Sequence, residues 1–316
     1  MITFLYKENG RVHMEKTRDS VAGFGDKEII GIDLESPTPE ERKQVETQYN
    51  IKLLSWQKAE EIESSSRYFE TDDTIIANSN YMKMENGRYD YMPVSFIIKN
   101  HILFSYHYDK VDSFKHVYDR VQAQSVSEMD GYDLFLLLLD VRIDYDADLL
   151  EAVGRSINQI SKKIRIDRDL DEESILQITQ LQEATMLLRE NIMDKQRVMS
   201  AILKSERFHG KKEGRLRIML KDTGSLLEHT AFSFERLEFL QDTLMGLIDI
   251  EQNKIIKMFS VVAVVFMPPT LIASMYGMNF RIMPELSWSF GYPFAIVLML
   301  ASSVLTLWYF HRKGWL

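Results

Sequence analysis

Three residues near the C-terminus, Gly277-Met278-Asn279, combine a flexible backbone position with a neutral side-chain amide. They lie between two apolar segments, 258–275 and 291–310, which carry no charged residue over about 18 and about 20 positions, the length of a membrane-spanning helix. The amide oxygen of Asn279 accepts hydrogen bonds from water around a hydrated cation, without the tight grip of a carboxylate ring on a bare ion. Gly277 allows the backbone to turn and expose its carbonyls. An uncharged turn at the mouth of a transmembrane hairpin suggests an entrance for ions.

The loop around this turn also permits structural interpretations. Gly277 fits a helix C-cap, with Asn279 in the turn that follows. Glu285, the only acid between the two apolar segments, either concentrates cations at the entrance or is a solvated loop acid. Pro268-Pro269 removes two backbone donors within the first segment, which predicts a packing kink or a gating hinge.

A stripe of mostly small or polar side chains precedes the turn. Steps of four and three residues keep one helix face directed toward a common axis in a left-handed bundle. Such a face either packs closely against another helix or lines a wet axis. Carboxylates that continue the stripe below the membrane repel one another around that axis unless water or cations separate them, which favours a cation pathway. The stripe consists of Asp242, Gly246, Asp249, Asn253, Ile256, Ser260, Ala263, Met267, Thr270 and Ser274.

A long helical pattern positions the stripe. No strong breaker occurs between Ser225 and Pro268, and a helix over 225–276 would extend roughly 78 Å, more than twice the roughly 30 Å of the hydrocarbon core. We therefore expect this helix to leave the membrane and continue in the cytoplasm; the alternative is a separate soluble helix joined by a bend near Lys254. Two further long helices are expected at 133–166 and 173–207, with a break at 208–214.

The N-terminal part mixes short apolar runs with polar turns. Runs at 28–34, 74–82, 92–98 and 102–106 are typical of strands, with Lys99-Asn100 as a hairpin turn between the last two. Helical patterns lie at 39–49 and 54–69, the first opened by Thr38 as N-cap and by Pro39. An α/β domain is the natural interpretation.

Charge and composition argue against several classes of function. The chain has 316 residues, a net charge of -9 and no cysteine, which argues against nucleic acid as a partner and excludes thiolate metal sites. No nucleophile–base pair or phosphate loop is visible, so we expect neither an enzyme nor an organic cofactor. The N-terminus lacks a signal-peptide pattern. Both ends are expected in the cytoplasm, because basic residues flank the apolar segments there: Lys254, Lys257, His311, Arg312 and Lys313.

Three motifs, Tyr276-Gly277-Met278-Asn279-Phe280, Met283-Pro284-Glu285-Leu286 and the terminal Lys313-Gly314-Trp315-Leu316, resemble the CorA family of magnesium transporters. The resemblance implies an α+β membrane protein with an N-terminal α/β cytoplasmic domain, long stalk helices and two C-terminal transmembrane helices per subunit, assembled as a funnel-shaped homopentamer. It implies passive, potential-driven uptake of Mg²⁺, and of Co²⁺ and Ni²⁺, across the cell inner membrane. Its partners would be copies of itself, the lipid bilayer and divalent cations.

The resemblance also implies roles for residues. Gly277, Met278 and Asn279 would form the selectivity filter. Glu61 and Asp222 would form a regulatory site between subunits, where internal Mg²⁺ holds the pore shut; the alternative is that both are ordinary solvated acids on helix surfaces. By the resemblance, Asn253, Met267, Thr270 and Asn279 match pore positions, with Asp242 near the inner vestibule. The stripe adds four residues to the expected pore lining: Ile256, Ser260, Ala263 and Ser274.

The expected parts follow from these patterns. They are a cytoplasmic α/β domain (1–128), a long-helix region (129–224), a stalk helix (225–276) whose span begins near 255, an external loop (277–289), a second span (290–310) and a cytoplasmic basic tail (311–316). The tail is less basic than the lysine run common in the family. A zinc transporter of the same superfamily and a membrane-anchored sensor or scaffold without flux stay open as alternatives.

Overall fold

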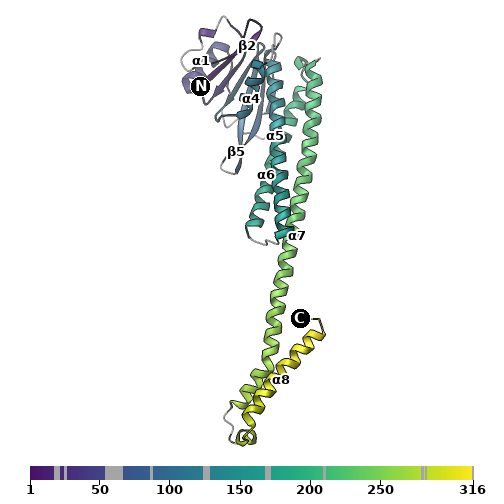
Figure 1. The fold of residues 1–316 in the computed structure, drawn as a ribbon. Coiled ribbons are helices and arrows are strands. Elements are labelled where there is room, and N and C mark those ends of the chain that lie inside the picture. Colours follow the sequence, from purple (N-terminus) through teal and green to yellow (C-terminus); the bar gives the residue numbers. More distant parts are fainter. Residues whose placement is uncertain are drawn as a thin grey trace. The chain divides into compact units, whose positions relative to one another are not determined.

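The computed structural model describes residues 1–17, 22–24, 27–53, 67–85, 88–123, 129–167, 172–208, 211–278, 281 and 283–314. The chain divides into two compact units, Met1–Gln241 and Asp242–Leu316. The division falls within one helix, α7 (Lys211–Tyr276) (Figure 1). We describe each unit by itself.

A mixed sheet dominates the first part of the first unit (Figure 1). Its order within the described residues is β2-β1-β3-β7-β6-β5-β4; β3 and β7 are parallel, and the other neighbours are antiparallel. Because parallel strands need a crossover connection, the chain forms the other half of the sheet before β7 returns to β3. The strands are β1 (Ile2–Glu8), β2 (Arg11–Thr17), β3 (Glu28–Glu35), β4 (Tyr68–Glu70), β5 (Thr74–Glu85), β6 (Arg88–Lys99) and β7 (Ile102–His107).

The two faces of the sheet belong to different hydrophobic cores, since successive strand residues point to opposite sides. Phe4 packs in the core that contains Val45 of α1 (Pro39–Tyr49), and its neighbour Leu5 packs in the core that contains Phe135 of α5 (Gly131–Lys162). The second core also takes side chains from α4 (Asp112–Ala123) and α6 (Glu172–Ile202). The sheet is thus covered on both faces, as the α/β interpretation requires.

The predicted strands over 28–34, 74–82, 92–98 and 102–106 and the helix over 39–49 are confirmed. Thr38 caps α1 through a reciprocal pair: its hydroxyl accepts from the Glu41 N–H at 3.2 Å and its own N–H donates to the Glu41 carboxylate at 2.9 Å. The N-cap and proline signals in the sequence were therefore sufficient to predict where this helix begins.

Other expectations for this unit need correction. The helix expected over 54–69 is wrong at its end, because Tyr68–Glu70 pairs with β5 as a strand; residues 54–66 lie outside the described part. The β6–β7 turn uses Asn100 and His101, both with positive φ, while Lys99 still pairs with Ile102. The pattern also missed β1, β2 and α4.

The long helices are present with shifted ends. α5 and α6 begin at Gly131 and Glu172, and α7 begins at Lys211, so Gly214 lies inside a helix rather than in the expected break. A glycine in a helix interior costs only about 1 kcal/mol, which the packing of a long helix readily offsets. A Cβ at Gly214 would meet no atom within 4 Å, so close packing does not require a glycine at this position.

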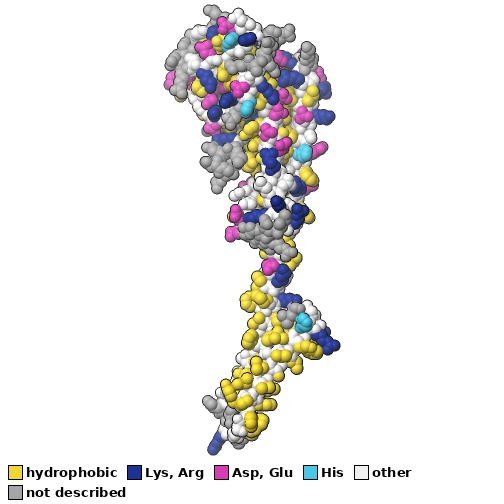
Figure 2. Space-filling view, viewed as in Figure 1, with side chains coloured by type: hydrophobic (Ala, Val, Ile, Leu, Met, Phe, Trp, Pro, Cys, Tyr) yellow, Lys and Arg dark blue, Asp and Glu magenta, His cyan; other side chains and the backbone are white. Residues whose placement is uncertain are grey.

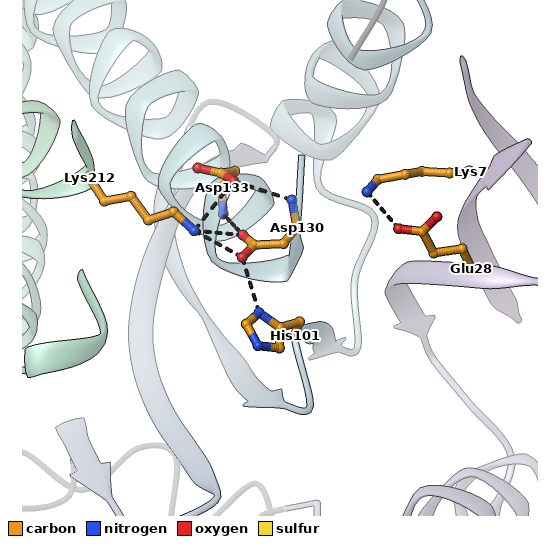
Figure 3. A network of polar contacts seen from close by, with 6 residues as sticks. All are labelled: Lys7, Glu28, His101, Asp130, Asp133 and Lys212. Atoms are coloured by element: carbon orange, nitrogen blue, oxygen red, sulfur yellow. Dashed lines mark hydrogen bonds and ion pairs between the residues drawn. The ribbon is translucent and has the colours of Figure 1, made fainter. Parts of the chain in front are cut away.

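An ionic network joins the starts of α5 and α7 (Figure 3). Asp130 caps α5 by accepting from the Asp133 N–H at 3.0 Å, and Lys212 donates to both carboxylate oxygens of Asp130 at 2.8 and 3.0 Å. His101 Nδ1 lies 3.2 Å from the same carboxylate. Burial opposes ionisation, but the hydrogen bonds from Lys212 and from the backbone lower the pKa of Asp130 to about 2. A second ion pair is separate from this network: Lys7 Nζ lies 2.7 Å from Glu28 Oε1.

The second unit contains the rest of α7, a short 3-10 turn, η4 (Pro284–Ser287), and helix α8 (Gly291–Arg312). Gly314, two residues after the end of α8, lies in the left-handed region with φ 69°, as is common for a glycine that follows a helix. Figure 2 shows hydrophobic side chains covering the visible face of this part of the chain.

Candidate ion pathway

Two helices of the described chain are long and apolar enough to cross a membrane, 212–276 and 291–312. In each helix, only 11% of the most apolar 18-residue stretch is buried within the chain. Side chains such as Phe259, Phe266 and Leu305 are 64%, 63% and 67% exposed. A surface of this kind is stable only against lipid or against other protein chains.

The predicted pore-lining stripe is exposed along its full length in the single chain. Ile256 and Met267 are 53% and 66% exposed, and the polar members between Asp242 and Ser274 are exposed as well. α8 does not cover this face. The buried side chains on the first apolar segment are instead Val261 and Val265.

The polar members of the stripe differ in how they are satisfied. Ser260 and Thr270 donate to the carbonyls of Ile256 and Phe266, at 2.8 and 2.7 Å, within their own helix. These hydroxyls therefore tolerate an apolar surrounding. Asn253, by contrast, has an exposed amide with no partner among the described residues. Because an unpaired amide is costly outside water, this side chain requires water, an ion's hydration shell or another copy.

α7 ends at Tyr276, directly before the predicted filter motif Gly277-Met278-Asn279. Gly277 N–H donates to the Ala273 carbonyl at 2.9 Å and Met278 N–H to the Met275 carbonyl at 3.4 Å. Gly277 directly follows α7, at the predicted C-cap position, but it does not adopt the left-handed conformation common for a glycine at a helix terminus. Asn279 lies outside the described residues.

The described part of the loop beyond the predicted filter contains a short 3-10 turn, η4. Pro284 opens η4, and its carbonyl accepts from the Ser287 hydroxyl at 2.7 Å. The ring of Trp288 lies 6.3 Å from that of Phe290 and 5.9 Å from that of Phe294. Glu285 is exposed and has no ion-pair partner within the described chain, so its charge is available to cations.

Of the two predicted regulatory residues, only Asp222 can be placed, since Glu61 lies outside the described residues. Asp222 is exposed on α7 near an acidic row on α5. Burial first, and then Asp140, Asp148 and Asp222, raise the pKa of Asp144, while Arg120 opposes them. The spacing of four residues along α5 was the sequence signal for this row, and our sequence analysis missed it.

A cavity of about 560 Å³ lies beside this row. His116 and Asp119 of α4 line it together with Asp144 and Asp148 of α5. The described residues contain no group of three or more acidic or histidine side chains arranged to hold a metal ion. A single chain therefore supplies an acidic surface here rather than a complete metal site.

Comparison with known proteins finds similarity over most or all of the chain. The family model described as CorA-like Mg²⁺ transporter protein matches residues 26–312. The magnesium transport protein CorA of Wolinella succinogenes is 32% identical over 321 residues, covering 100% of both chains. That of Escherichia coli K12 is 37% identical over 290 residues, covering 91% of this chain and 92% of the relative. The complete structure of the CorA magnesium transporter from Methanocaldococcus jannaschii has a TM-score of 0.84 at 18% identity, covering 100% of this chain and 99% of the other.

Proposed function

Because this chain belongs to the CorA-like Mg²⁺ transporter family, we propose that it takes up Mg²⁺ passively through a pore enclosed by identical subunits. A divalent ion moving inward across about 100 mV gains roughly 4.6 kcal/mol, so uptake needs no chemical fuel. The assembly is a homopentamer in the cell inner membrane, with both chain termini in the cytoplasm. Co²⁺ and Ni²⁺ follow the same path.

One observation carries the proposal: the small and polar stripe of α7 is exposed in the single chain, while the opposite side of the same segment contains the buried Val261 and Val265. A polar face that one chain leaves open is best satisfied by symmetric copies around a wet axis. The unpaired amide of Asn253 supports this arrangement, because water on the axis satisfies it.

The stripe divides into parts with different chemistry. Asp242 and Asn253 form polar rings on the cytoplasmic side, where carboxylates and amides attract cations and hold their water. Ile256 and Met267 form apolar constrictions, which gate by excluding water. Ser260, Ala263, Thr270 and Ser274 are small enough to leave room for a hydrated ion between them.

The outer mouth selects the ion. Gly277, Met278 and Asn279 form the filter, in which the Asn279 amide accepts hydrogen bonds from coordinated water. This suits Mg²⁺, since the ion gives up its water reluctantly. Glu285 raises the local concentration of cations in front of the filter.

Internal Mg²⁺ closes the pore at a site between subunits, with Asp222 from one subunit and Glu61 from its neighbour. The exposed position of Asp222 and the raised pKa of Asp144 beside it support this proposal. Arg120, 3.8 Å from Asp144, and Arg215, 3.9 Å from Asp140, compensate this negative charge only in part, so a divalent cation between subunits would neutralise more of it.

Two rival functions make different predictions. A zinc transporter would show Zn²⁺ flux exceeding Mg²⁺ flux, but the curated relatives named above are magnesium transport proteins. A scaffold without flux would pass neither ion.

The deciding experiment is ion uptake into proteoliposomes under an imposed potential. We expect Mg²⁺ uptake by the native chain, suppression when Mg²⁺ is added inside, and loss of uptake in Asn279→Ala. Glu61→Ala and Asp222→Ala should retain uptake and lose the suppression. Equal Mg²⁺ uptake into vesicles with the native chain and with Asn279→Ala would overturn the proposal.

A further inference from the structure

Gly291, the first residue of α8, is buried against the backbone of the loop before it. A Cβ atom placed there would lie 2.2 Å from the carbonyl oxygen of Glu285 and 3.4 Å from its carbonyl carbon. Close-packed atoms do not approach so closely, so even a methyl group would displace the loop. The glycine is needed here for space rather than for an unusual backbone angle, because its φ is not positive.

Hydrogen bonds hold the loop in this seat. Gly291 N–H donates to the Trp288 carbonyl at 2.9 Å, and Trp288 N–H donates to the Glu285 carbonyl at 3.4 Å. The same Glu285 carbonyl therefore lies over Gly291 and accepts from Trp288. The backbone at Glu285 is fixed from two sides, although its carboxylate stays exposed.

An aromatic clamp reinforces the seat. Trp288 packs against Phe290 and Phe294, with ring centroids 6.3 and 5.9 Å apart. Phe290 is the N-cap residue of α8, and Phe294 lies one turn into the helix. The loop carrying Glu285 is thus fastened to a helix that spans the membrane.

We propose that Gly291 is a positioning residue for cation uptake, which seats the Glu285 carbonyl on the first turn of α8 and so fixes the Glu285 carboxylate at the outer mouth. The inference rests on the proposed function and deepens it. A fixed charge attracts ions more effectively than one on a displaced or mobile loop, because the field of an exposed charge is screened within about 8–10 Å in physiological salt. The ligand is a hydrated divalent cation.

The test measures Mg²⁺ uptake into proteoliposomes as a function of external Mg²⁺ for the native chain, Gly291→Ala, Glu285→Gln and the double variant. We expect each single variant to raise the half-saturating Mg²⁺ concentration by about threefold to tenfold, with maximal uptake within about twofold of native. The double variant should match Glu285→Gln alone, because both changes remove the same attraction. In Gly291→Ala the half-saturating concentration should also depend less on external salt, which a general loss of structure would not produce.

Trp288→Ala provides a second route, because it removes the aromatic clamp and leaves Gly291 intact. It should shift half-saturation in the same direction and also be non-additive with Glu285→Gln. Gly154→Ala is the matched control, since a Cβ there meets no atom within 4 Å; it should leave uptake unchanged.

The outcomes separate the two proposals. No Mg²⁺ uptake by the native chain contradicts the proposed function. Native uptake with an unchanged half-saturation in both Gly291→Ala and Trp288→Ala contradicts the positioning role, as does a double variant whose effect is the product of the single effects.

Discussion

Lys195 Nζ lies 3.0 Å from Asp146 Oδ2, with the two side chains 0% and 1% exposed. Arg142 approaches the same carboxylate at 2.9 Å, and Asn191 donates to it at 3.0 Å. These contacts join α5 to α6 beneath the sheet, where Lys195 also donates to the Asn80 carbonyl at 3.1 Å. Burial lowers the pKa of Lys195 to about 8, while Asp146 opposes that shift. The charges hold the helices in one register against β5.

Removing one partner of this network should be costly. Lys195→Met leaves Asp146 buried beside Arg142 with fewer donors, and a broken buried pair typically costs about 3–5 kcal/mol. We expect a large drop in the thermal midpoint of the full chain in detergent. The combined variant Asp146→Asn with Lys195→Met should cost less than the sum of the two single changes; full additivity would show that the residues do not act as a pair.

His107 and Asp33 predict a pH dependence of stability. His107 Nδ1 lies 2.6 Å from the Asp109 carbonyl, which only accepts, and Nε2 lies 3.0 Å from the Asp33 carboxylate. Both ring nitrogens therefore donate, as in the charged imidazolium. Burial is the largest single influence and lowers the pKa of His107. The charge of Asp33, the hydrogen bonds to Asp33 and to the Asp109 carbonyl, and the charge of Glu35 together outweigh it and raise the pKa above 6.5.

The sign follows from linkage. A folded-state pKa above the unfolded value stabilises the fold fully below about pH 6.5, and the contribution is lost as pH rises through the raised pKa. We expect the difference in unfolding free energy between the native chain and His107→Gln to shrink on raising the pH from about 6 to about 9. A difference that is constant with pH would contradict a charged His107. Ser105, which donates to Asp33 at 2.6 Å, stays unchanged in both proteins.

The ion pair between Lys212 and Asp130 should stabilise the start of α5. Asp130→Ala removes both the helix cap and the acceptor of Lys212, and loss of a cap alone costs about 1 kcal/mol. We expect a lower thermal midpoint for Asp130→Ala, and a smaller decrease for Lys212→Met, because the cap remains. Equal effects of the two variants would indicate that the cap contributes nothing.

The absence of cysteine permits a direct test of the axis. Ser274→Cys and Ser260→Cys should form disulfide-linked dimers on mild oxidation in membranes, because the proposed assembly turns the stripe toward its own copies. Met258→Cys is the matched control: it is also exposed, 56% for the native side chain, but lies about 160° around the helix from Ser260. Cross-linking of Met258→Cys and not of the serine positions would place the stripe toward lipid.

Local patterns predicted the elements that depend on local interactions. The capped helix after Thr38, the strands rich in β-branched and aromatic residues and the two uncharged spans follow from hydrogen bonds and apolar periods within a few residues. β2 was missed because Val12 is its one fully buried residue, so it carries no clear alternation. Tyr68–Glu70 was missed because a short edge strand is defined by its partner β5.

The sequence by itself determined that two helices can cross a membrane, that a stripe of small and polar residues runs along the first of them, and that a neutral amide follows it. Only the tertiary structure decided that α8 leaves this stripe open, that Gly291 accommodates the Glu285 carbonyl, and that His107 meets Asp33 across 74 residues. The physical reason is that helix periods and caps arise from neighbours along the chain, whereas exposure, steric fit and buried ion pairs arise from segments that meet only after folding.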